Sequence, residues 1–518
     1  QNLVNLPYDV FSDAYVDSTV FILEDQPQQI TDVEALNSEV LVINYDRKEE
    51  LSQIEPTESN SSLIKYSRWF SEHLDADSTY EFLSYLNKSK LNIEEKVAKK
   101  GTELSEFADV QRGITPFDLV EETGDQYAPA LDGGLRRYTY HFSGTKYVEY
   151  HEDIAEYKPE RYFEGERLIL RELISRQFRI QLILTDKDFV TNKSYQSILV
   201  QDEKYDAGYL LAVLNSSLLS FYHVQRSAVA LRDDFPKIVL SETRSLPIPE
   251  IDFSEDGLNG EINTNEVTVN SGHVLLDDGR GFEIESNTKT HDLLSQLARS
   301  TMEKHRRYRK FNLEITDYLG NYNSGPTLND VGLVQPAKGV GQSILHETTE
   351  EKPNLRTENI EIIRESPNTI EIQLSARYKP DDDSLETDRW GYTETELLPA
   401  LRITDLTEIE ADLIEAFVPI AIDKAEGFAN FRSTATKSNS LIDRLKALTL
   451  PVVSDVKSEL REYIETKERA EEVESEIMRT ESLIDDIVIE LFDIESANKE
   501  LIDEPIETLS PDLRSVNE

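Results

Sequence analysis

Residues 161–200 read RYFEGERLILRELISRQFRIQLILTDKDFVTNKSYQSILV. Short apolar runs alternate here with polar and charged residues, a pattern typical of short strands joined by loops. The same pattern extends over residues 104–251, where Pro247 and Pro249 indicate a boundary. Residues 104–251 are therefore predicted to form one domain of mixed helices and strands.

This stretch carries more basic residues than its surroundings. The chain has 54 Lys and Arg against 101 Asp and Glu, a formal net charge of −47. Residues 161–200 nevertheless hold seven bases and five acids, and residues 299–310 hold six bases and one acid. Such cations either contact nucleic-acid phosphates or pair with local acids and cover a core. The seven bases are Arg161, Arg167, Arg171, Arg176, Arg179, Lys187 and Lys193.

Two explanations fit the overall acidity. One is a protein that avoids nucleic acid. The other is adaptation to a high-salt cytoplasm, where carboxylates keep the surface hydrated and molar salt shortens the Debye length to about 3 Å. The acids are spread along the whole chain and are not gathered in a tail, which favours a halophilic protein. Net charge therefore does not exclude DNA binding.

Composition excludes several classes of protein. The chain has no cysteine, which excludes disulfides, thiolate zinc sites, iron–sulfur clusters and cysteine nucleophiles. No stretch approaches the ~18–20 uncharged apolar residues of a membrane helix, and the N-terminus lacks the segments of a signal peptide. We therefore expect a cytoplasmic protein. Because the first residue is Gln1 and not Met, we also expect a fragment of a longer polypeptide.

Residues 1–58 contain two strand signals, YVDSTVFILE at 15–24 and VLVINY at 40–45. Two strands cannot bury a core alone, so we interpret them as the closing strands of a sheet whose other strands lie before Gln1. The alternative is an edge hairpin on the next domain. Residues 59–103 are predicted to be a helical linker.

Residues 252–406 are predicted to hold three features. A polar segment rich in Gly, Asn and Asp reads as an insertion, and a basic helix follows that Thr290 can cap. The third feature is a β-hairpin around Pro367 and Asn368, where apolar and polar residues alternate on both sides.

Residues 407–518 are predicted to be helical, with breaks at Pro419 and Pro451 and a last long helix over 456–492. An apolar stripe along this helix has heptad-like spacing. The stripe indicates either a coiled-coil arm that contacts a partner or the rest of the chain, or a helical hairpin that packs on its own domain with a solvated acidic face. Its residues are Val473, Ile477, Ile484, Ile487 and Leu491.

The sequence contains no complete catalytic or metal-binding motif that we recognise. The eight histidines include no pair at the i,i+4 spacing of a helical zinc site, and no metal site is expected. Neither the GxxxxGK[ST] phosphate loop, a GxGxxG after a strand nor a GxSxG nucleophile turn occurs. We therefore expect no catalytic residue within this chain.

An ordered set of segments resembles a known family. It is the TaqI-like C-terminal specificity domain, the target-recognition domain of adenine-specific DNA methyltransferases that include fused type II restriction–modification enzymes. The segments are ADVQRGITPF (108–117), YKPERYFEGERLILREL (157–173), FVTNKSYQSIL (189–199), GYLLAVLNSSLLSFYH (208–223) and LSETRSLPIPEI (240–251). NLPYDVFSDAYVDSTVFILE (5–24) resembles the strand after the catalytic motif, and SLIDDIVIELFDI (482–494) resembles the closing helix of the fused enzymes.

The resemblance implies which residues contact DNA. Arg112 and Gly113 resemble the loop that opens the recognition domain, where glycine lets backbone approach the duplex. Arg171 and the TNKSY segment resemble strand ends that face DNA, where Asn192 and Lys193 can contact bases or phosphates. The expected DNA-binding residues are Arg112, Gly113, Arg171, Arg176, Arg179, Asn192, Lys193, Arg226, Arg306 and Arg307.

Other residues of the recognition domain are expected to be structural. Asn215 is expected to cap or end a helix, away from DNA. The apolar residues around it are expected to be core, and they are Leu210, Leu211, Val213, Leu214 and Leu218.

The chain departs from the family in one respect. The methylases hold a flipped adenine with an Asn/Asp-Pro-Pro-Tyr/Phe loop, and no such tetrapeptide occurs here. The glycine-rich turn that holds S-adenosylmethionine is also missing. The resemblance therefore implies a catalytic domain before Gln1 that binds S-adenosylmethionine, which this chain does not bind.

We thus expect an α+β chain: the remnant of an α/β methyltransferase sheet, a recognition domain and a mainly helical C-terminal region. The expected function is recognition of double-stranded DNA for an adenine-specific methyltransferase in restriction–modification or phage defence. One alternative is a standalone specificity or scaffold subunit that docks on a separate methyltransferase. Another is an acidic interaction protein without a nucleic-acid role.

Overall fold

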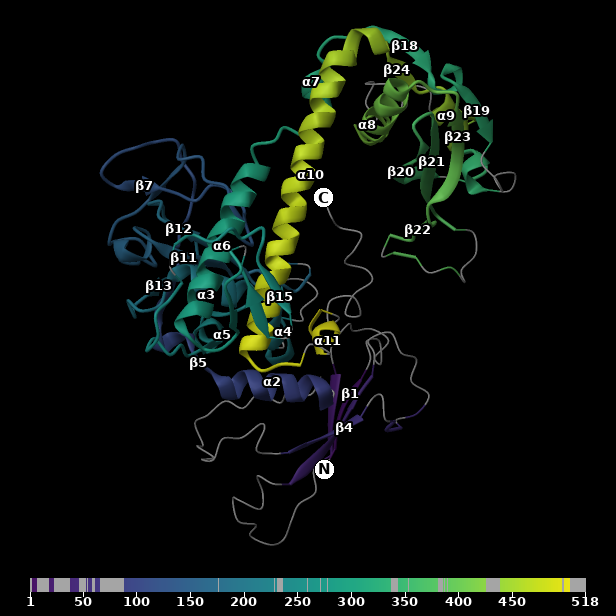
Figure 1. Cartoon of the computed structure of the whole chain (residues 1–518). Helices are drawn as coiled ribbons and strands as arrows, with labels where there is room; N and C mark the ends of the chain where they lie inside the picture. Colours follow the sequence, from purple (N-terminus) through teal and green to yellow (C-terminus); the bar gives the residue numbers. More distant parts are fainter. Residues whose placement is uncertain are drawn as a thin grey trace. The chain divides into compact units, whose positions relative to one another are not determined.

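The chain divides into two compact units in the computed structural model (Figure 1). Unit 1 comprises Gln1–Arg306 and Ser475–Glu518, and unit 2 comprises Arg307–Glu474. Both units contain helices and strands, which confirms the expected α+β class. The structure describes residues 2–6, 18–22, 38–45, 53, 55–57, 61–65, 88–175, 177–227, 229–230, 236–258, 260–270, 272–276, 278–336, 343–352, 354–380, 385, 387–388, 390–424, 438–495 and 498–503.

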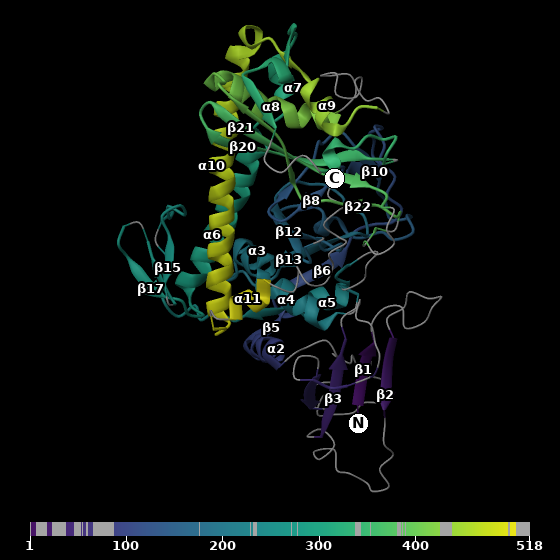
Figure 2. The ribbon, with the colours of Figure 1, turned by 90° about the vertical axis from the view of Figure 1, so that its right-hand side faces the viewer.

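The centre of unit 1 is a four-stranded antiparallel sheet. Its strands are β6 (Ala108–Arg112), β11 (Arg167–Arg171), β12 (Gln181–Thr185) and β13 (Tyr195–Val200), in the order β12-β11-β13-β6. Figure 1 labels β11, β12 and β13, and Figure 2 labels β6. Because side chains alternate along a strand, Leu168 and Leu170 face one side of the sheet and Ile169 faces the other. Leu168 and Leu170 belong to the large core of unit 1, and Ile169 belongs to a smaller cluster with Ile183. The sheet is therefore buried on both faces.

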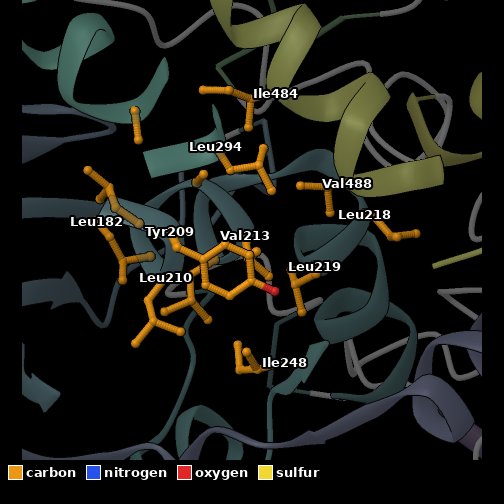
Figure 3. Close-up of a cluster of buried hydrophobic side chains, with 14 of the residues drawn as sticks. Leu182, Tyr209, Leu210, Val213, Leu218, Leu219, Ile248, Leu294, Ile484 and Val488 are labelled. Atoms are coloured by element: carbon orange, nitrogen blue, oxygen red, sulfur yellow. The ribbon is translucent and has the colours of Figure 1, made fainter. Parts of the chain in front are cut away.

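Two short helices, α3 (Ala207–Asn215) and α4 (Ser217–Arg226), lie in the large core. The ring of Tyr209 lies among aliphatic side chains that include Leu210, Leu219 and Ile248 (Figure 3). Its hydroxyl donates to the Pro249 carbonyl at 3.0 Å, so the one polar atom of the ring has a partner. The expected core leucines and Val213 are fully buried, which confirms that expectation.

Polar side chains define the ends of these two helices. Asp206 caps α3 by accepting from the Gly208 amide at 2.7 Å, and Ser216 caps α4. Asn215 ends α3 and exchanges two hydrogen bonds with the backbone of Leu182 in β12, as a helix-terminating residue should. Among the described residues no single helix is long and apolar enough to cross a membrane. Only α3 and α4 taken together, bent by 59°, reach that length and composition.

Helices α6 (Thr288–Tyr308) and α10 (Val453–Leu491) complete the core of unit 1, and they lie side by side in both views (Figures 1 and 2). Lys304 donates to the Thr480 hydroxyl at 2.7 Å. The apolar stripe of α10 is buried, and Ile484, Ile487 and Leu491 belong to the unit 1 core. These three residues therefore contact the rest of the chain, which was part of the first interpretation, and they do not pack within a separate helical domain at 407–518.

The start of α6 corrects one prediction. The helix begins at Thr288, so Thr290 lies inside it and does not cap it. The side chain of Asn287 accepts a hydrogen bond from the Thr290 amide at 3.1 Å instead. Asparagine and threonine are both good capping residues, and the residue just outside the first turn supplies the cap here.

Short strands and helices surround the core of unit 1. Antiparallel pairs are β5 (Gly101–Glu103) with β14 (Pro247–Pro249), β7 (Tyr127–Pro129) with β10 (Tyr147–Glu149), and β8 (Leu135–Arg136) with β9 (Thr139–Tyr140). Strands β15 (Thr268–Asn270), β16 (His273–Leu275) and β17 (Gly281–Glu283) form a meander within the expected insertion. The remaining helices are α2 (Lys88–Lys100), α5 (Leu240–Arg244) and α11 (Lys499–Asp503).

The N-terminal part of unit 1 is a separate four-stranded sheet. It contains β1 (Asn2–Leu6), β2 (Ser18–Ile22), β3 (Glu39–Asn44) and β4 (Ser61–Lys65), ordered β2-β1-β3-β4. The two expected strands are β2 and β3. They have neighbours within the chain itself, β1 and β4, which the sequence interpretation did not foresee.

Strand β4 also corrects the prediction of a helical linker over 59–103. Residues 61–65 form a strand because they pair with β3, where fully buried Ile64 lies opposite Val40. Pairing of this kind overrides local helix propensity, which is a weak signal. The helical part of the linker that the structure describes is α2, and residues 66–87 lie outside the described residues.

Unit 2 is built around a second sheet with helices. The neighbouring strands of this sheet are, in order, β19 (Leu333–Pro336), β23 (Leu398–Thr404), β21 (Thr369–Tyr378) and β20 (Arg356–Ser366). Strand β22 (Thr393–Glu394) also pairs with β21. The other elements are β18 (Ser324–Thr327), β24 (Thr449–Pro451), α7 (Ile315–Leu319), α8 (Glu408–Lys424), α9 (Leu441–Lys446) and the first part of α10. This unit crosses the expected boundary between residues 406 and 407.

The predicted hairpin of unit 2 is confirmed, because β20 and β21 are antiparallel and meet at Pro367 and Asn368. The predicted break at Pro419 is wrong, because α8 continues through it. A proline inside a helix costs a hydrogen bond, but the neighbouring Phe417 and Val418 are fully buried and hold the helix in place.

His223 of α4 makes stability depend on pH. It is 3% exposed, and burial lowers its pKa from 6.5 to about 4. The unfolded chain therefore binds one more proton between these two pH values, and His223 reduces stability as the pH falls from 6.5 to 4. The free energy of unfolding of wild type should fall by about 3 kcal/mol between pH 6.5 and pH 4 because of His223, and the variant His223→Leu should lack this loss.

The measurement is urea unfolding of wild type and His223→Leu at pH 7 and at pH 4.5. The difference between the two proteins should grow in favour of the variant as the pH falls. An equal loss of stability in both would mean that the histidine is protonated in the folded state.

The last turns of α10 should contribute strongly to unit 1. Ile487 is fully buried in its core, whereas Met478 on the same helix is 61% exposed. Ile487→Ala should lower the free energy of unfolding of unit 1 by about 2–5 kcal/mol. Met478→Ala should change it by less than about 0.5 kcal/mol.

Hydrogen exchange followed by mass spectrometry on β11 and α4 measures this difference within unit 1. If both variants exchange at the wild-type rate, the end of α10 does not belong to the core.

Candidate nucleic-acid interface

One end of the central sheet brings several of the predicted residues together. Neighbouring strands in the order β12-β11-β13-β6 are antiparallel, so β6 and β11 run in the same direction. Their last residues therefore lie at the same end of the sheet as the first residues of β12 and β13. Arg112 is paired with Gln196 there, and Arg171 with Tyr195.

The loop before β13 packs tightly against Gly113. The Gly113 amide donates to the Tyr195 carbonyl at 3.0 Å, and the Ile114 amide donates to the Thr191 carbonyl at 2.9 Å. A Cβ atom at position 113 would lie 2.1 Å from the Thr191 carbonyl oxygen and 2.3 Å from that of Asn192. The close approach that requires glycine is thus to this loop of the same chain, which differs from the expected approach to a duplex.

Asn192 and Lys193 form the tip of this loop. The side chain of Asn192 accepts a hydrogen bond from the Ser194 amide at 2.8 Å, which stabilises the turn into β13. The next residue, Lys193, is exposed. The turn therefore has one residue that shapes it and one cation that reaches solvent.

Arg171 occupies one face of the sheet end. Its guanidinium donates to the Leu135 carbonyl at 3.4 Å, and the side chain is half-buried. Tyr195 lies beside it on the same face because the two residues are paired. Burial raises the pKa of Tyr195, and the positive charge of Arg171 opposes part of that shift.

Arg112 occupies the opposite face. Its Nη2 atom donates to one carboxylate oxygen of Glu172 at 2.6 Å, and its Nε atom lies 2.5 Å from the other oxygen. Glu172 is buried, and it also accepts a hydrogen bond from the Gln196 side chain at 3.3 Å. The two arginines of the sheet end thus differ: Arg112 is paired with an acid, and Arg171 contacts a carbonyl.

Two further cations lie at this end and were missed from the sequence. Arg136 is exposed and adjoins Leu135, and half-buried Lys237 forms a bridge with Leu173 just beyond β11. Lys237 stands in a stretch with no excess of bases, so only its pairing with Leu173 could have revealed it. We use the name basic end for Arg112, Arg136, Arg171, Lys193 and Lys237.

Two other expected DNA-binding residues pair with buried acids of distant helices. Arg179 is almost buried, and its Nη2 atom lies 3.3 Å from the Asp485 carboxylate of α10. Burial lowers the pKa of Arg179. Arg226 pairs with fully buried Glu94 of α2. Because these arginines pair with acids of α10 and α2, outside the central sheet, we leave them out of the proposed site.

The remaining expected residues do not join the basic end. Arg176 lies outside the described residues. Arg306 is exposed on α6, 3.5 Å from Glu303, and Arg307 belongs to unit 2. These two residues stay predictions.

Several cations of the two basic segments serve structure. Arg167 is fully buried, donates to the carbonyls of Gly165 and Phe189, and has its pKa lowered by burial to about 10. Arg299 bonds to the carboxylates of Asp206 and Glu166. In both segments, therefore, part of the basic charge is explained by internal contacts.

One cluster superficially resembles a catalytic triad. Ser295 donates to Asp206, and His291 is bonded to the carboxylate of Asp292. The other ring nitrogen of His291 accepts from the Asp206 backbone amide at 3.0 Å, so it cannot take a proton from Ser295. The described residues also contain no group of His, Asp and Glu that could hold a metal ion.

Residues 128–248 match the family model of the TaqI-like C-terminal specificity domain. This match covers most of the basic end and confirms the resemblance inferred from the sequence. This part of the chain is therefore similar to a specificity domain of this family.

A relative from Methanocaldococcus jannaschii, named as a type II restriction enzyme and methyltransferase, is 30% identical over 255 residues. The matched region is 48% of this chain and 21% of that relative, so the chain spans about a fifth of the relative's length. Among solved structures, the Type-I restriction-modification system S subunit from M. genitalium shares 12% identity. That match covers 76% of this chain and 95% of the subunit with a TM-score of 0.34, too low to carry an argument.

The glycine contact gives a direct test of the loop geometry. Gly113→Ala should destabilise unit 1 by about 1–3 kcal/mol, because the new Cβ overlaps two backbone carbonyls and the loop must move. Gly134→Ala is the matched control, since nothing lies within 4 Å of a Cβ there.

Thermal unfolding of both variants measures the effect. Equal melting temperatures for the two would show that the 191–195 loop does not pack on Gly113 as described.

Proposed function

We propose that this chain recognises a specific sequence in double-stranded DNA. The observation that carries the proposal is the basic end, where five cations, one of them paired with Glu172, lie at one end of the central sheet in a protein with a net charge of −47. Lys and Arg side chains supply most contacts to DNA phosphates, and Arg also reads base edges. The family match at 128–248 and the restriction–modification relative support the same function.

We further propose that the whole enzyme is an adenine-specific DNA methyltransferase of a restriction–modification or phage-defence system. It would transfer a methyl group from S-adenosylmethionine to the amino group of a flipped adenine. No residue of this chain is assigned to that step, because the sequence lacks both the methylase tetrapeptide and the glycine-rich turn. The role left to this chain is to grip the duplex and read its sequence.

The N-terminal sheet is proposed to close the catalytic domain of the same polypeptide. Its register places Ile22, Leu41 and Leu63 on one face, and Ile22 and Leu63 are 52% and 62% exposed. These two exposed apolar side chains fit burial against another protein surface. The same face also fits the alternative, a standalone specificity subunit docked on a separate methyltransferase.

The acidic surface supports adaptation to a salt-rich cytoplasm. In molar salt the gain from counterion release is largely lost. DNA recognition would then depend on hydrogen bonds and shape more than on charge. A titration of DNA affinity between moderate and molar salt tests this, and a steep fall would contradict it.

Charge reversal at the basic end should abolish DNA binding. Arg171→Glu combined with Lys193→Glu replaces two cations with two anions, so the surface would repel the phosphates. We expect at least about a hundredfold weaker binding of a pool of random-sequence duplexes, measured by fluorescence anisotropy. Lys204→Glu is the matched control, because Lys204 is exposed beyond the opposite end of β13.

The control should bind DNA within about threefold of wild type at the same salt concentration. If the double variant also keeps wild-type affinity, the chain is an interaction protein whose basic end does not contact nucleic acid.

A further inference from the structure

Glu172 fixes the position of Arg112. One carboxylate oxygen accepts a hydrogen bond from Nη2, and the other lies 2.5 Å from Nε without a hydrogen bond. The acid is 5% exposed, whereas the arginine side chain is 39% exposed. The pair therefore has a buried anchor and a head that reaches the surface.

The anchor itself is held on both sides. The Glu172 amide donates to the Ser194 carbonyl at 2.8 Å, and the Glu172 carbonyl accepts from the Ile238 amide at 2.9 Å. The Gln196 amide group donates to both the Glu172 carboxylate and the Ile238 carbonyl, each at 3.3 Å. Rotation of the Glu172 side chain would break this network, so the carboxylate is preorganised.

The pairing leaves one edge of the guanidinium free. A guanidinium carries five N–H donors in one plane, and Glu172 lies at the edge formed by Nε and Nη2. The adjacent edge, formed by Nη1 and the second hydrogen of Nη2, has two parallel donors. No described residue accepts a hydrogen bond from Nη1 of Arg112.

The charge of the Arg112–Glu172 pair determines which acceptor group the free edge of the guanidinium binds best. Glu172 carries a charge opposite to that of Arg112, which weakens attraction to a phosphate but leaves the direction of the free donors unchanged. A neutral base edge with two adjacent acceptors matches such a group, and guanine offers O6 and N7 in the major groove. Lys193 is exposed without a carboxylate contact in the described structure and suits a phosphate.

We propose that Arg112 reads a guanine with its free edge and that Glu172 is the positioning residue that aims it. This rests on the proposed function, since it names the base that the basic end recognises. Arg112→Lys keeps the charge but loses the planar pair of donors. Glu172→Gln keeps the shape of the anchor but loses its charge.

The experiment is selection of bound duplexes from a random-sequence pool by the full chain, as wild type and as three variants. Wild type should enrich a site that contains a guanine. Arg112→Lys should lose the preference at that one position by roughly 5- to 150-fold. Glu172→Gln should weaken it at the same position, and the double variant should lose no more than Arg112→Lys alone.

The matched control is Lys193→Ala. It should bind all sequences more weakly, keep the preferred site and lower the slope of log affinity against log salt by about 0.9. As a second readout, 7-deazaguanine at the preferred position should weaken wild-type binding several-fold and leave Arg112→Lys unaffected, because only N7 is removed.

The outcomes separate the two proposals. If wild type enriches no sequence, the result contradicts both the proposed function and the proposed guanine contact. If wild type enriches a site but Arg112→Lys only lowers affinity uniformly, Arg112 contacts a phosphate and the guanine contact alone falls. Melting temperatures identify any variant that unfolds. If Glu172→Gln unfolds, the test of the guanine contact rests on Arg112→Lys, which keeps the partner Glu172.

Discussion

Strand β11 is hydrogen-bonded along both edges and buried on both faces, and the recognition features depend on this constraint. A shift of one residue against β13 would exchange Leu168 and Leu170 with Ile169 between two differently shaped cores. The same shift would move Arg171 to the face of Glu172 and break the pairing of Arg112. The fixed register therefore sets which cation is paired with an acid and which is not.

The structure uses basic residues in two ways that the sequence cannot separate. Arg179 and Arg226 neutralise buried acids that come from α10 and α2, so they join elements distant in sequence. The cations of the basic end lie where strands terminate and solvent begins. In a chain this acidic, an internal acid partner is easily found, and even within the basic end Arg112 is paired with Glu172.

Sequence patterns predicted the elements whose signal is local. The β20–β21 hairpin, the long helix α10 and the buried run around Tyr209 all carry strong periodicity or turn residues. The patterns failed where distant pairing decides, as at β4, which forms a strand only because β3 lies beside it. Lys237 and the Glu172 partner of Arg112 were missed for the same reason, since residues far apart in the chain bring them together.

The continuity of α10 has a consequence for the order in which the protein is built. Residues 475–491 complete the core of unit 1, yet the ribosome makes them only after the whole of unit 2. At about 5–20 residues per second, the incomplete core waits roughly 8–35 s for its last helix. During that interval the apolar surface that Ile484 and Ile487 will cover is open, and exposed apolar surface of this kind favours aggregation of nascent chains.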